Sequence, residues 1–241
     1  MTQTVRYDNG IYVGETVEGK RHGFGRYEWK DGSSYEGEFV WGQRMGRGVF
    51  TWPDGSSYEG DFYEDKRTGR GIFRFPNGNR YEGEFVAGRM TGVGVFYFAS
   101  GDKYEGSFED GARTGLGVFT WARGERSVGM FCRGQREGIT TLIYPDGSLF
   151  VGGYLHDKRH GEGVYTKADG SAEKQVWEMG EMISSTPSAV AELAADTEER
   201  VTELREETDE VERLLRSGLF DTGKRAERAR EAQRIGAEDI Q

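Results

Sequence analysis

The segment Tyr35–Ser57, YEGEFVWGQRMGRGVFTWPDGSS, is one unit of a repeat that decides the fold. Its first tyrosine and the glycine two residues later recur every 23 residues. A fixed period of this length is typical of stacked supersecondary units rather than of one globular core. The pair occurs at Tyr12/Gly14, Tyr35/Gly37, Tyr58/Gly60, Tyr81/Gly83 and Tyr104/Gly106, continues with a changed first residue at Ser127/Gly129 and Phe150/Gly152, and fades at Glu173/Gln175.

Each repeat contains two short runs that alternate with period two. The run YEGEF at 35–39 places its aromatic residues and glycine on one face and its glutamates on the other. The run GRGVFTW at 46–52 places both glycines, Phe50 and Trp52 on one face. Aromatic and β-branched residues favour strands, so the repeat predicts two β-strands with one aromatic face and one carboxylate face, the latter solvated.

Turn sequences separate one repeat from the next. Glycine after aspartate or asparagine supplies the positive φ of a tight turn, and connections this short make neighbouring strands antiparallel. We therefore expect a mainly β fold: an elongated single-layer antiparallel meander of seven to eight hairpins over residues 1–182. The turns are Asp31-Gly32, Pro53-Asp54-Gly55, Pro76-Asn77-Gly78, Pro145-Asp146-Gly147 and Asp169-Gly170.

The composition changes at residue 183, where we expect a linker over 183–189 and a helical tail over 190–241. Charge is segregated in the tail, with a net −8 over residues 192–212 and +4 over residues 213–234. Apolar residues at spacings of three and four predict an amphipathic helix with a docking stripe, which must pack on the repeats, on itself or on another protein. The stripe is Val190, Leu193, Val201, Leu204, Val211 and Leu215.

Composition argues against several classes of function. The net charge of −10 and the lack of a basic face disfavour nucleic-acid binding. There is no signal pattern and no apolar run of membrane-spanning length, so we expect a soluble, cytoplasmic protein. His22 and His160 share one repeat position, which indicates a structural role, and no nucleophile–base or metal constellation occurs. We expect no enzymatic activity, no cofactor and no metal.

The pattern Tyr-Glu-Gly-x-Phe followed by Gly-x-Gly-x-Phe/Tyr-x-Trp/Phe resembles the MORN repeat (membrane occupation and recognition nexus), in seven copies over residues 12–172. The resemblance implies a twisted single-layer sheet with an aromatic-lined groove and a scaffolding role. The sequence GQREG at 134–138, with the next Gly-x-Gly broken at Thr140, is similar to MORN proteins of the radial spoke head. That similarity implies the axoneme of a cilium or flagellum, within the cytoskeleton.

The aromatic face is the predicted partner-binding groove. Its rings either only pack on one another or also contact a helix or peptide of another protein in a large complex; open strand edges also permit a homodimer. The alternative function is a tether to acidic membrane lipids through basic pairs such as Lys20-Arg21, Lys66-Arg67 and Lys158-Arg159. The predicted groove residues are Trp29, Phe50, Trp52, Phe73, Phe75, Phe96, Phe98, Phe119, Trp121 and Tyr144.

Overall fold

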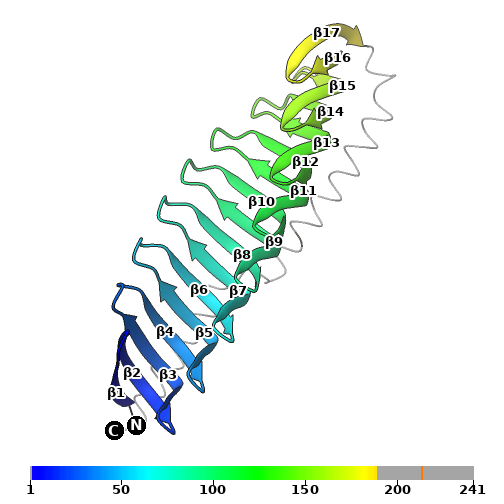
Figure 1. Ribbon diagram of the computed structural model, residues 1–241. Coiled ribbons are helices and arrows are strands. Elements are labelled where there is room, and N and C mark those ends of the chain that lie inside the picture. The colour runs from blue at the N-terminus through cyan, green and yellow to red at the C-terminus, as the bar shows by residue number, and fades with distance from the viewer. Residues whose placement is uncertain (1, 189–212, 214–241) are drawn as a thin grey trace. The chain divides into compact units, whose positions relative to one another are not determined.

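The computed structural model describes residues 2–188 and Arg213, and residues 2–188 form 17 antiparallel strands (Figure 1). The mainly β meander expected from the repeat is confirmed. The strands are β1 Thr2–Tyr7, β2 Gly10–Val17, β3 Lys20–Trp29, β4 Ser34–Val40, β5 Gln43–Thr51, β6 Ser57–Tyr63, β7 Lys66–Arg74, β8 Arg80–Val86, β9 Arg89–Tyr97, β10 Lys103–Glu109, β11 Ala112–Thr120, β12 Arg126–Cys132, β13 Gln135–Ile143, β14 Leu149–Leu155, β15 Lys158–Thr166, β16 Ala172–Glu178 and β17 Glu181–Ser188.

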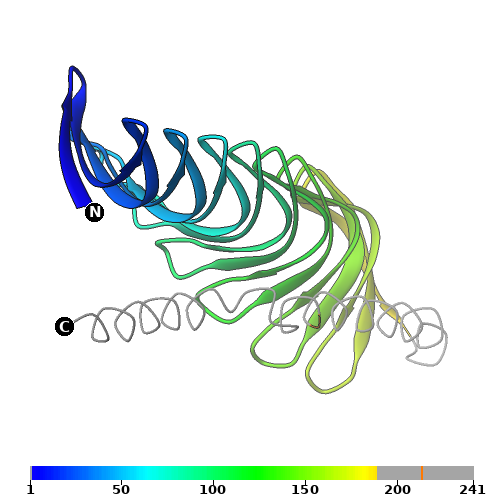
Figure 2. The ribbon, with the colours of Figure 1, turned by 90° about the horizontal axis from the view of Figure 1, so that it is seen from below.

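The described residues form two compact units. Unit 1 contains residues 2–76 and 82–88, and unit 2 contains residues 77–81, 89–188 and 213. Within each unit, one repeat is one hairpin, and the second strand of that hairpin pairs with the first strand of the next, as β4–β5 and then β5–β6 do. Figure 2 shows that the strands of each unit lie in a single layer and are bowed. A single layer cannot bury both faces, so the packing that holds each unit together lies on one of them.

Two kinds of turn connect the strands. Within a hairpin, two residues with positive φ make the turn, as Trp41 (52°) and Gly42 (92°) do between β4 and β5. Both central residues of a type I′ turn have positive φ, and this turn matches the twist of paired strands. Between hairpins, the carboxylate of Asp54 accepts hydrogen bonds from the amide (2.9 Å) and hydroxyl (2.6 Å) of Ser56. The Asp-Gly turns predicted from the sequence are therefore present and are closed by their own side chains.

The core of each repeat is a tyrosine ring lying over glycines. Tyr35 is fully buried, and a side chain added at either Gly37 or Gly48 would collide with its ring. The Tyr35 hydroxyl donates to the carbonyl oxygen of Glu38 at 3.1 Å, which satisfies the buried phenol. These paired glycines therefore leave room for the tyrosine, as the alternating sequence pattern suggests.

One of the paired glycines lies differently from the prediction. Gly46 was expected on the aromatic face with Gly48, but a Cβ at Gly46 would meet the Glu38 carboxylate. The cause is a β-bulge, because the register shifts between Gly37 and Phe39 and Gly46 has a φ of 61°. The Glu38 carboxylate accepts a hydrogen bond from the amide of Arg47 in the bulge at 3.3 Å. The carboxylate face is thus not only solvated, since some of its acids bind backbone.

The two ends of the described array differ from the expected boundaries. Strand β1 was not predicted and pairs with β2. Strand β17 occupies Glu181–Ser188, so most of the segment expected to be a linker over 183–189 is instead paired with β16. The hairpin β16–β17 is the eighth. The predicted helical tail and its docking stripe, Val190, Leu193, Val201, Leu204, Val211 and Leu215, lie outside the described residues.

Candidate partner-binding face

The aromatic face consists of two ring ladders. The inner ladder is buried and made of edge-to-face contacts: the Tyr35 ring lies 5.1 Å from Phe39 and 5.0 Å from Phe62 of the next repeat. The outer ladder is made of tilted rings, with Trp52 4.4 Å from Phe50 and 5.4 Å from Phe73. Such ring pairs contribute about 0.5–1.5 kcal/mol each beyond the burial of their area. Each ladder therefore joins successive repeats.

The predicted groove residues all belong to the outer ladder. Phe50 is buried and the other nine are half-buried. They contact one another, as Phe119 does with Phe98 (5.6 Å) and Trp121 (4.7 Å) in unit 2. Packing between these rings and partial exposure of the same rings thus occur together. Binding of a partner to them stays a prediction.

A guanidinium lies in a cage of four rings between the two ladders. The Arg44 guanidinium carbon is 5.7 Å from the Tyr35 ring and 5.0 Å from the Phe50 ring, and it also contacts Trp29 and Phe62. Arg67 in unit 1 and Arg113 in unit 2 have the same four-ring cage. The equivalent positions, 23 residues apart, are Arg21, Arg44, Arg67, Met90, Arg113, Arg136 and Arg159.

Each caged arginine also binds the hairpin turn of the next repeat. Arg67 donates to the carbonyl oxygen of Gly88 at 2.7 Å. Where the turn glycine is replaced by aspartate, the arginine forms an ion pair instead, and Arg44 lies 2.9 Å from Asp65. Burial lowers the pKa of Arg67 and Arg113, but a guanidinium remains charged at neutral pH. The arginines therefore bring positive charge into the aromatic face and join consecutive repeats.

The sequence interpretation missed these cages, although their signal was visible. Each of Arg21, Arg67 and Arg159 follows a lysine at a hairpin turn, so the sequence interpretation assigned all three to basic pairs at one edge of the sheet. Their constant distance from the first residue of the repeat was not used. A recurrence of arginine nine residues after the first residue of the repeat could have placed them on the aromatic face. Of each basic pair, only the lysine is exposed, as Lys66 and Lys158 are.

The hairpin β12–β13 departs from this pattern and opens the face. Ser127 stands where the first five repeats have tyrosine and the seventh has phenylalanine. Thr140 replaces the glycine under the ring, and Leu142 replaces an outer ring. Ser127 and Thr140 are both fully buried. As a result, the Arg136 guanidinium contacts only two rings, Trp121 at 5.5 Å and Tyr154 at 4.5 Å.

Two adjoining cavities of about 430 and 350 Å³ lie at this opening in unit 2. We call them together the open hollow. Both are lined by Trp121, Arg136 and Asp157; Leu142, Tyr144 and Trp177 are among the further lining residues of the larger one, and Phe98 and Arg113 of the smaller one. Four predicted groove residues of unit 2 line the open hollow: Phe98, Phe119, Trp121 and Tyr144.

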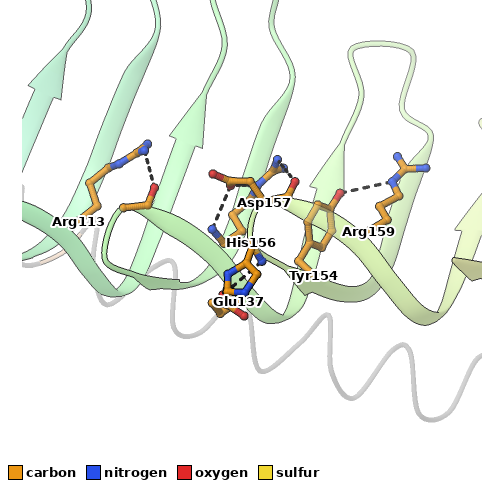
Figure 3. Close-up of polar contacts among 8 residues, drawn as sticks. Arg113, Glu137, Tyr154, His156, Asp157 and Arg159 are labelled. Carbon is orange, nitrogen blue, oxygen red and sulfur yellow. Dashed lines mark hydrogen bonds and ion pairs between the residues drawn. The ribbon is translucent and has the colours of Figure 1, made fainter. Parts of the chain in front are cut away.

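The open hollow combines aromatic surface with positive charge, and Figure 3 shows the contact between two of its lining residues, Tyr154 and Arg159. The Arg159 guanidinium lies 4.1 Å from the Phe150 ring and 4.6 Å from the Trp177 ring, and it donates to the hydroxyls of Tyr144 and Tyr154. Arg136 forms an ion pair with Asp157 at 2.9 Å. This surface can bind a segment that carries both apolar side chains and carboxylates.

The carboxylate Oε2 of Glu125 is another feature of the open hollow. It is buried and has no hydrogen-bond partner among the described residues, whereas Oε1 pairs with Arg123 at 2.6 Å. A buried acceptor without a donor is destabilising.

The histidines serve turns rather than chemistry. The imidazole of His156 lies 3.0 Å from the Glu137 carboxylate, which also accepts the His156 amide (Figure 3). His160 occupies the position of Glu137 in the next repeat, and its Nδ1 accepts the amide of Met179 at 3.5 Å. The described residues contain no group of three or more His, Cys, Asp or Glu placed to hold a metal. Within that same part of the chain, no helix is long and apolar enough to cross a membrane.

The family model described as "MORN repeat" matches six segments that together cover more than half of the 241 residues. The chain belongs to the MORN repeat family. The matched segments are 12–34, 35–57, 58–80, 81–103, 104–126 and 150–172. The MORN repeat is non-catalytic in this family and serves as an interaction scaffold for proteins or membranes. The unmatched segment 127–149 is the hairpin with Ser127 and Thr140, which folds as its neighbours do.

The solved structures that resemble this MORN chain include a TCP domain and a TCP10 domain. The TCP domain of SAS-4 (dCPAP) from Drosophila Melanogaster, in complex with a proline-rich motif of Ana2 (dSTIL), is 10% identical with a TM-score of 0.45, over 73% of this chain and 90% of that one. The wild-type TCP10 domain of Danio rerio CPAP is 13% identical with a TM-score of 0.34, over 78% and 95%. Neither likeness bears on function. A search of curated proteins returns no match.

Proposed function

We propose that this protein is a non-catalytic scaffold whose aromatic face holds a segment of another protein within a large assembly. The observation that carries the proposal is the open hollow, where half-buried rings and guanidiniums line about 430 Å³ beside Trp121 and Arg136. Aromatic side chains and arginine are enriched among residues that dominate protein interfaces. Four rings contact the Arg113 guanidinium and two contact that of Arg136, and both guanidiniums line the open hollow.

Removal of one ring from the hollow tests the proposal. We expect Trp121→Ala to weaken binding of partner proteins from a cell extract by about thirtyfold or more, since loss of a central interface tryptophan costs about 2 kcal/mol or more. The thermal unfolding temperature is measured in parallel.

Trp41→Ala is the matched control. Trp41 is 50% exposed at a hairpin turn, and Ala87 occupies the equivalent turn position with a φ of 49°, so alanine is tolerated there. The same partners should bind wild type and Trp41→Ala. Equal loss of capture in both variants, or loss only in step with stability, would contradict the proposal.

The assembly we propose is cytoskeletal, in the axoneme of a cilium or flagellum, at the radial spoke head. What supports this placement is the similarity of residues 134–138, with the break at Thr140, to radial spoke head MORN proteins. A tagged full-length copy in ciliated cells should co-localise with axonemal tubulin after detergent removes the membrane. A uniformly soluble signal would argue against this placement.

A tether to acidic lipids is the competing function, and the side-chain positions disfavour it. The arginines of the basic pairs fold into the aromatic face: Arg67 lies 5.0 Å from the Phe73 ring, and Arg159 lies 4.1 Å from the Phe150 ring. Only the lysines remain exposed at the turns, and each basic residue near a membrane surface contributes about 1 kcal/mol. Salt-sensitive co-sedimentation of the protein with phosphatidylserine vesicles would favour the tether over the scaffold.

A further inference from the structure

We infer that the acidic segment 190–215 of this same chain occupies the open hollow and competes there with the partner. The inference rests on the proposed function, because it treats the aromatic face as a docking surface. Its consequence is regulation: the partner binds the face only in the fraction of molecules whose own segment is displaced.

Charge complementarity is the first argument. Five basic side chains and three acidic ones line the hollow, an excess of two positive charges in a chain whose net charge is −10. Residues 192–212 carry a net −8. Opposite potentials favour association and select among partners. The lining groups are Arg113, Arg123, Arg136, Lys158 and Arg159 against Asp102, Glu125 and Asp157.

Two guanidiniums of the hollow are not neutralised by the repeats. Arg113 donates to the carbonyl oxygen of Gly134, and Arg159 donates to two tyrosine hydroxyls. Among the described residues neither forms a salt bridge with a carboxylate. Charge-assisted hydrogen bonds from guanidinium to carboxylate are stronger than those to neutral oxygen. Carboxylates are therefore the groups that this hollow would bind most strongly.

The place where the described array ends is the second argument. Ser188, the last residue of β17, pairs with Ala172 on β16, five residues along that strand from Trp177, which lines the hollow. Five strand residues span about 17 Å, and the four residues from Ser188 to Glu192 reach about 13 Å when extended. The first acidic side chain of the segment can therefore approach the hollow.

The length of the segment is the third argument. The spacing of its apolar residues predicts a helix, and the 23 residues that follow Glu192 would be about 35 Å long as a helix. The nine strands β9–β17 of unit 2, at about 4.8 Å per strand, extend over about 38 Å. The segment can thus lie across the aromatic face of unit 2, with its apolar stripe toward the half-buried rings and its carboxylates near the arginines.

Carbodiimide crosslinking of the full-length protein tests the inference, because it joins a lysine amine directly to a nearby carboxylate. Lys158 is the reporter in the hollow, and Lys66 is the control, since both are exposed at the same repeat position. We expect Lys158 to crosslink with carboxylates of residues 192–212 at least about tenfold more than Lys66 does, because a tethered segment has a high effective concentration at its site. Equal yields from the two lysines would overturn the inference.

Mixed isotopes separate docking within one chain from docking between two chains. Crosslinks in an equal mixture of ¹⁵N-labelled and unlabelled protein should join peptides of the same label. A substantial share of mixed-label pairs would overturn the inference and assign the segment to a second copy. Arg159→Gln should lower the Lys158 yield several-fold with Lys158 still present, whereas Arg67→Gln should not change it.

The inference and the proposed function can fail separately. If the segment does not crosslink to Lys158 but Trp121→Ala still loses the partner, only the inference is wrong. If the segment crosslinks but Trp121→Ala retains the partner, the proposed function is wrong. When both hold, the double variant Glu199→Gln/Glu206→Gln, with Arg159 left unchanged, removes two negative charges from the segment. This variant should bind the partner more tightly, because the fraction of molecules whose hollow is free of the segment rises.

Discussion

Arg113 and Arg136 occupy the same position in adjacent hairpins of unit 2, yet their surroundings differ. Arg113 is enclosed by four rings, and Arg136 contacts two. The difference follows from Ser127 and Leu142, which replace one inner and one outer ring of the repeat. The backbone pairing is kept in both hairpins. A repeat can therefore lose one inner and one outer ring and keep its fold.

The largest expected effect is a fall in the free energy of unfolding at alkaline pH, caused by the buried tyrosines that the hairpin with Ser127 lacks. Burial raises the pKa of Tyr35, Tyr58 and Tyr104 above the usual value of 10.0, whereas the hairpin with Ser127 has no tyrosine at this position. The folded state disfavours the phenolate, so stability is unaffected below the unfolded pKa and falls as pH rises above it. The three groups together should cost about 4 kcal/mol per pH unit above pH 10.

Ultraviolet absorbance of the phenolate, followed with circular dichroism, measures this effect. We expect part of the tyrosine absorbance to appear only as the β signal is lost. Full ionisation of all tyrosines near pH 10 while the protein remains folded would show that these rings are accessible.

The second effect exchanges residues between the hairpins. Gly117→Thr places the threonine of the divergent hairpin under the Tyr104 ring, which a Cβ at this position would strike. We expect the free energy of unfolding to fall by about 3 kcal/mol, which is the upper end of the usual cost of overpacking a core. Urea unfolding measures the loss, and Tyr104→Ser in the same chain should restore part of it. If Gly117→Thr is neutral, the ring is not fixed by the glycine.

The third effect comes from a substitution that removes one tyrosine hydroxyl. Tyr104→Phe copies the natural Phe150 and deletes the hydrogen bond from the phenol to the carbonyl oxygen of Ser107, 3.1 Å long. A lost hydrogen bond of this kind costs about 1 kcal/mol. The variant should be less stable at pH 7 but closer to wild type above pH 10, where it has one fewer group to ionise. Urea unfolding at both pH values measures the difference.

The smallest expected effect comes from a substitution that places a ring back in the hollow. Leu142→Phe restores an outer ring beside Arg136, as Phe119 lies beside Arg113 at 5.4 Å. We expect stability to rise by about 0.5 kcal/mol, the low end of a cation–π contact, and capture of the partner to fall. A variant that is more stable and still captures the partner fully would place binding elsewhere.

Much of the fold could be predicted from the sequence because the same pattern of residues recurs in each repeat. The tyrosine, the glycines and the Asp-Gly turns predicted the hairpins and the aromatic face. The side of Gly46 could not be predicted, since period two fails at a bulge. The arginine cages were missed because the rings around Arg44 come from two repeats and meet only in space. The tail lies outside the described residues, so its role remains a proposal.

Binding on the aromatic face rather than the carboxylate face is the central claim, and photo-crosslinking tests it most directly. Leu142 and Ile139 lie on the same strand, with Leu142 lining the hollow and Ile139 44% exposed on the other face. A photoreactive residue is placed at each position of the full-length protein in its own cells. Adducts with another protein should form from position 142 and not from position 139. Equal adducts from both positions, or adducts from 139 alone, would contradict the account.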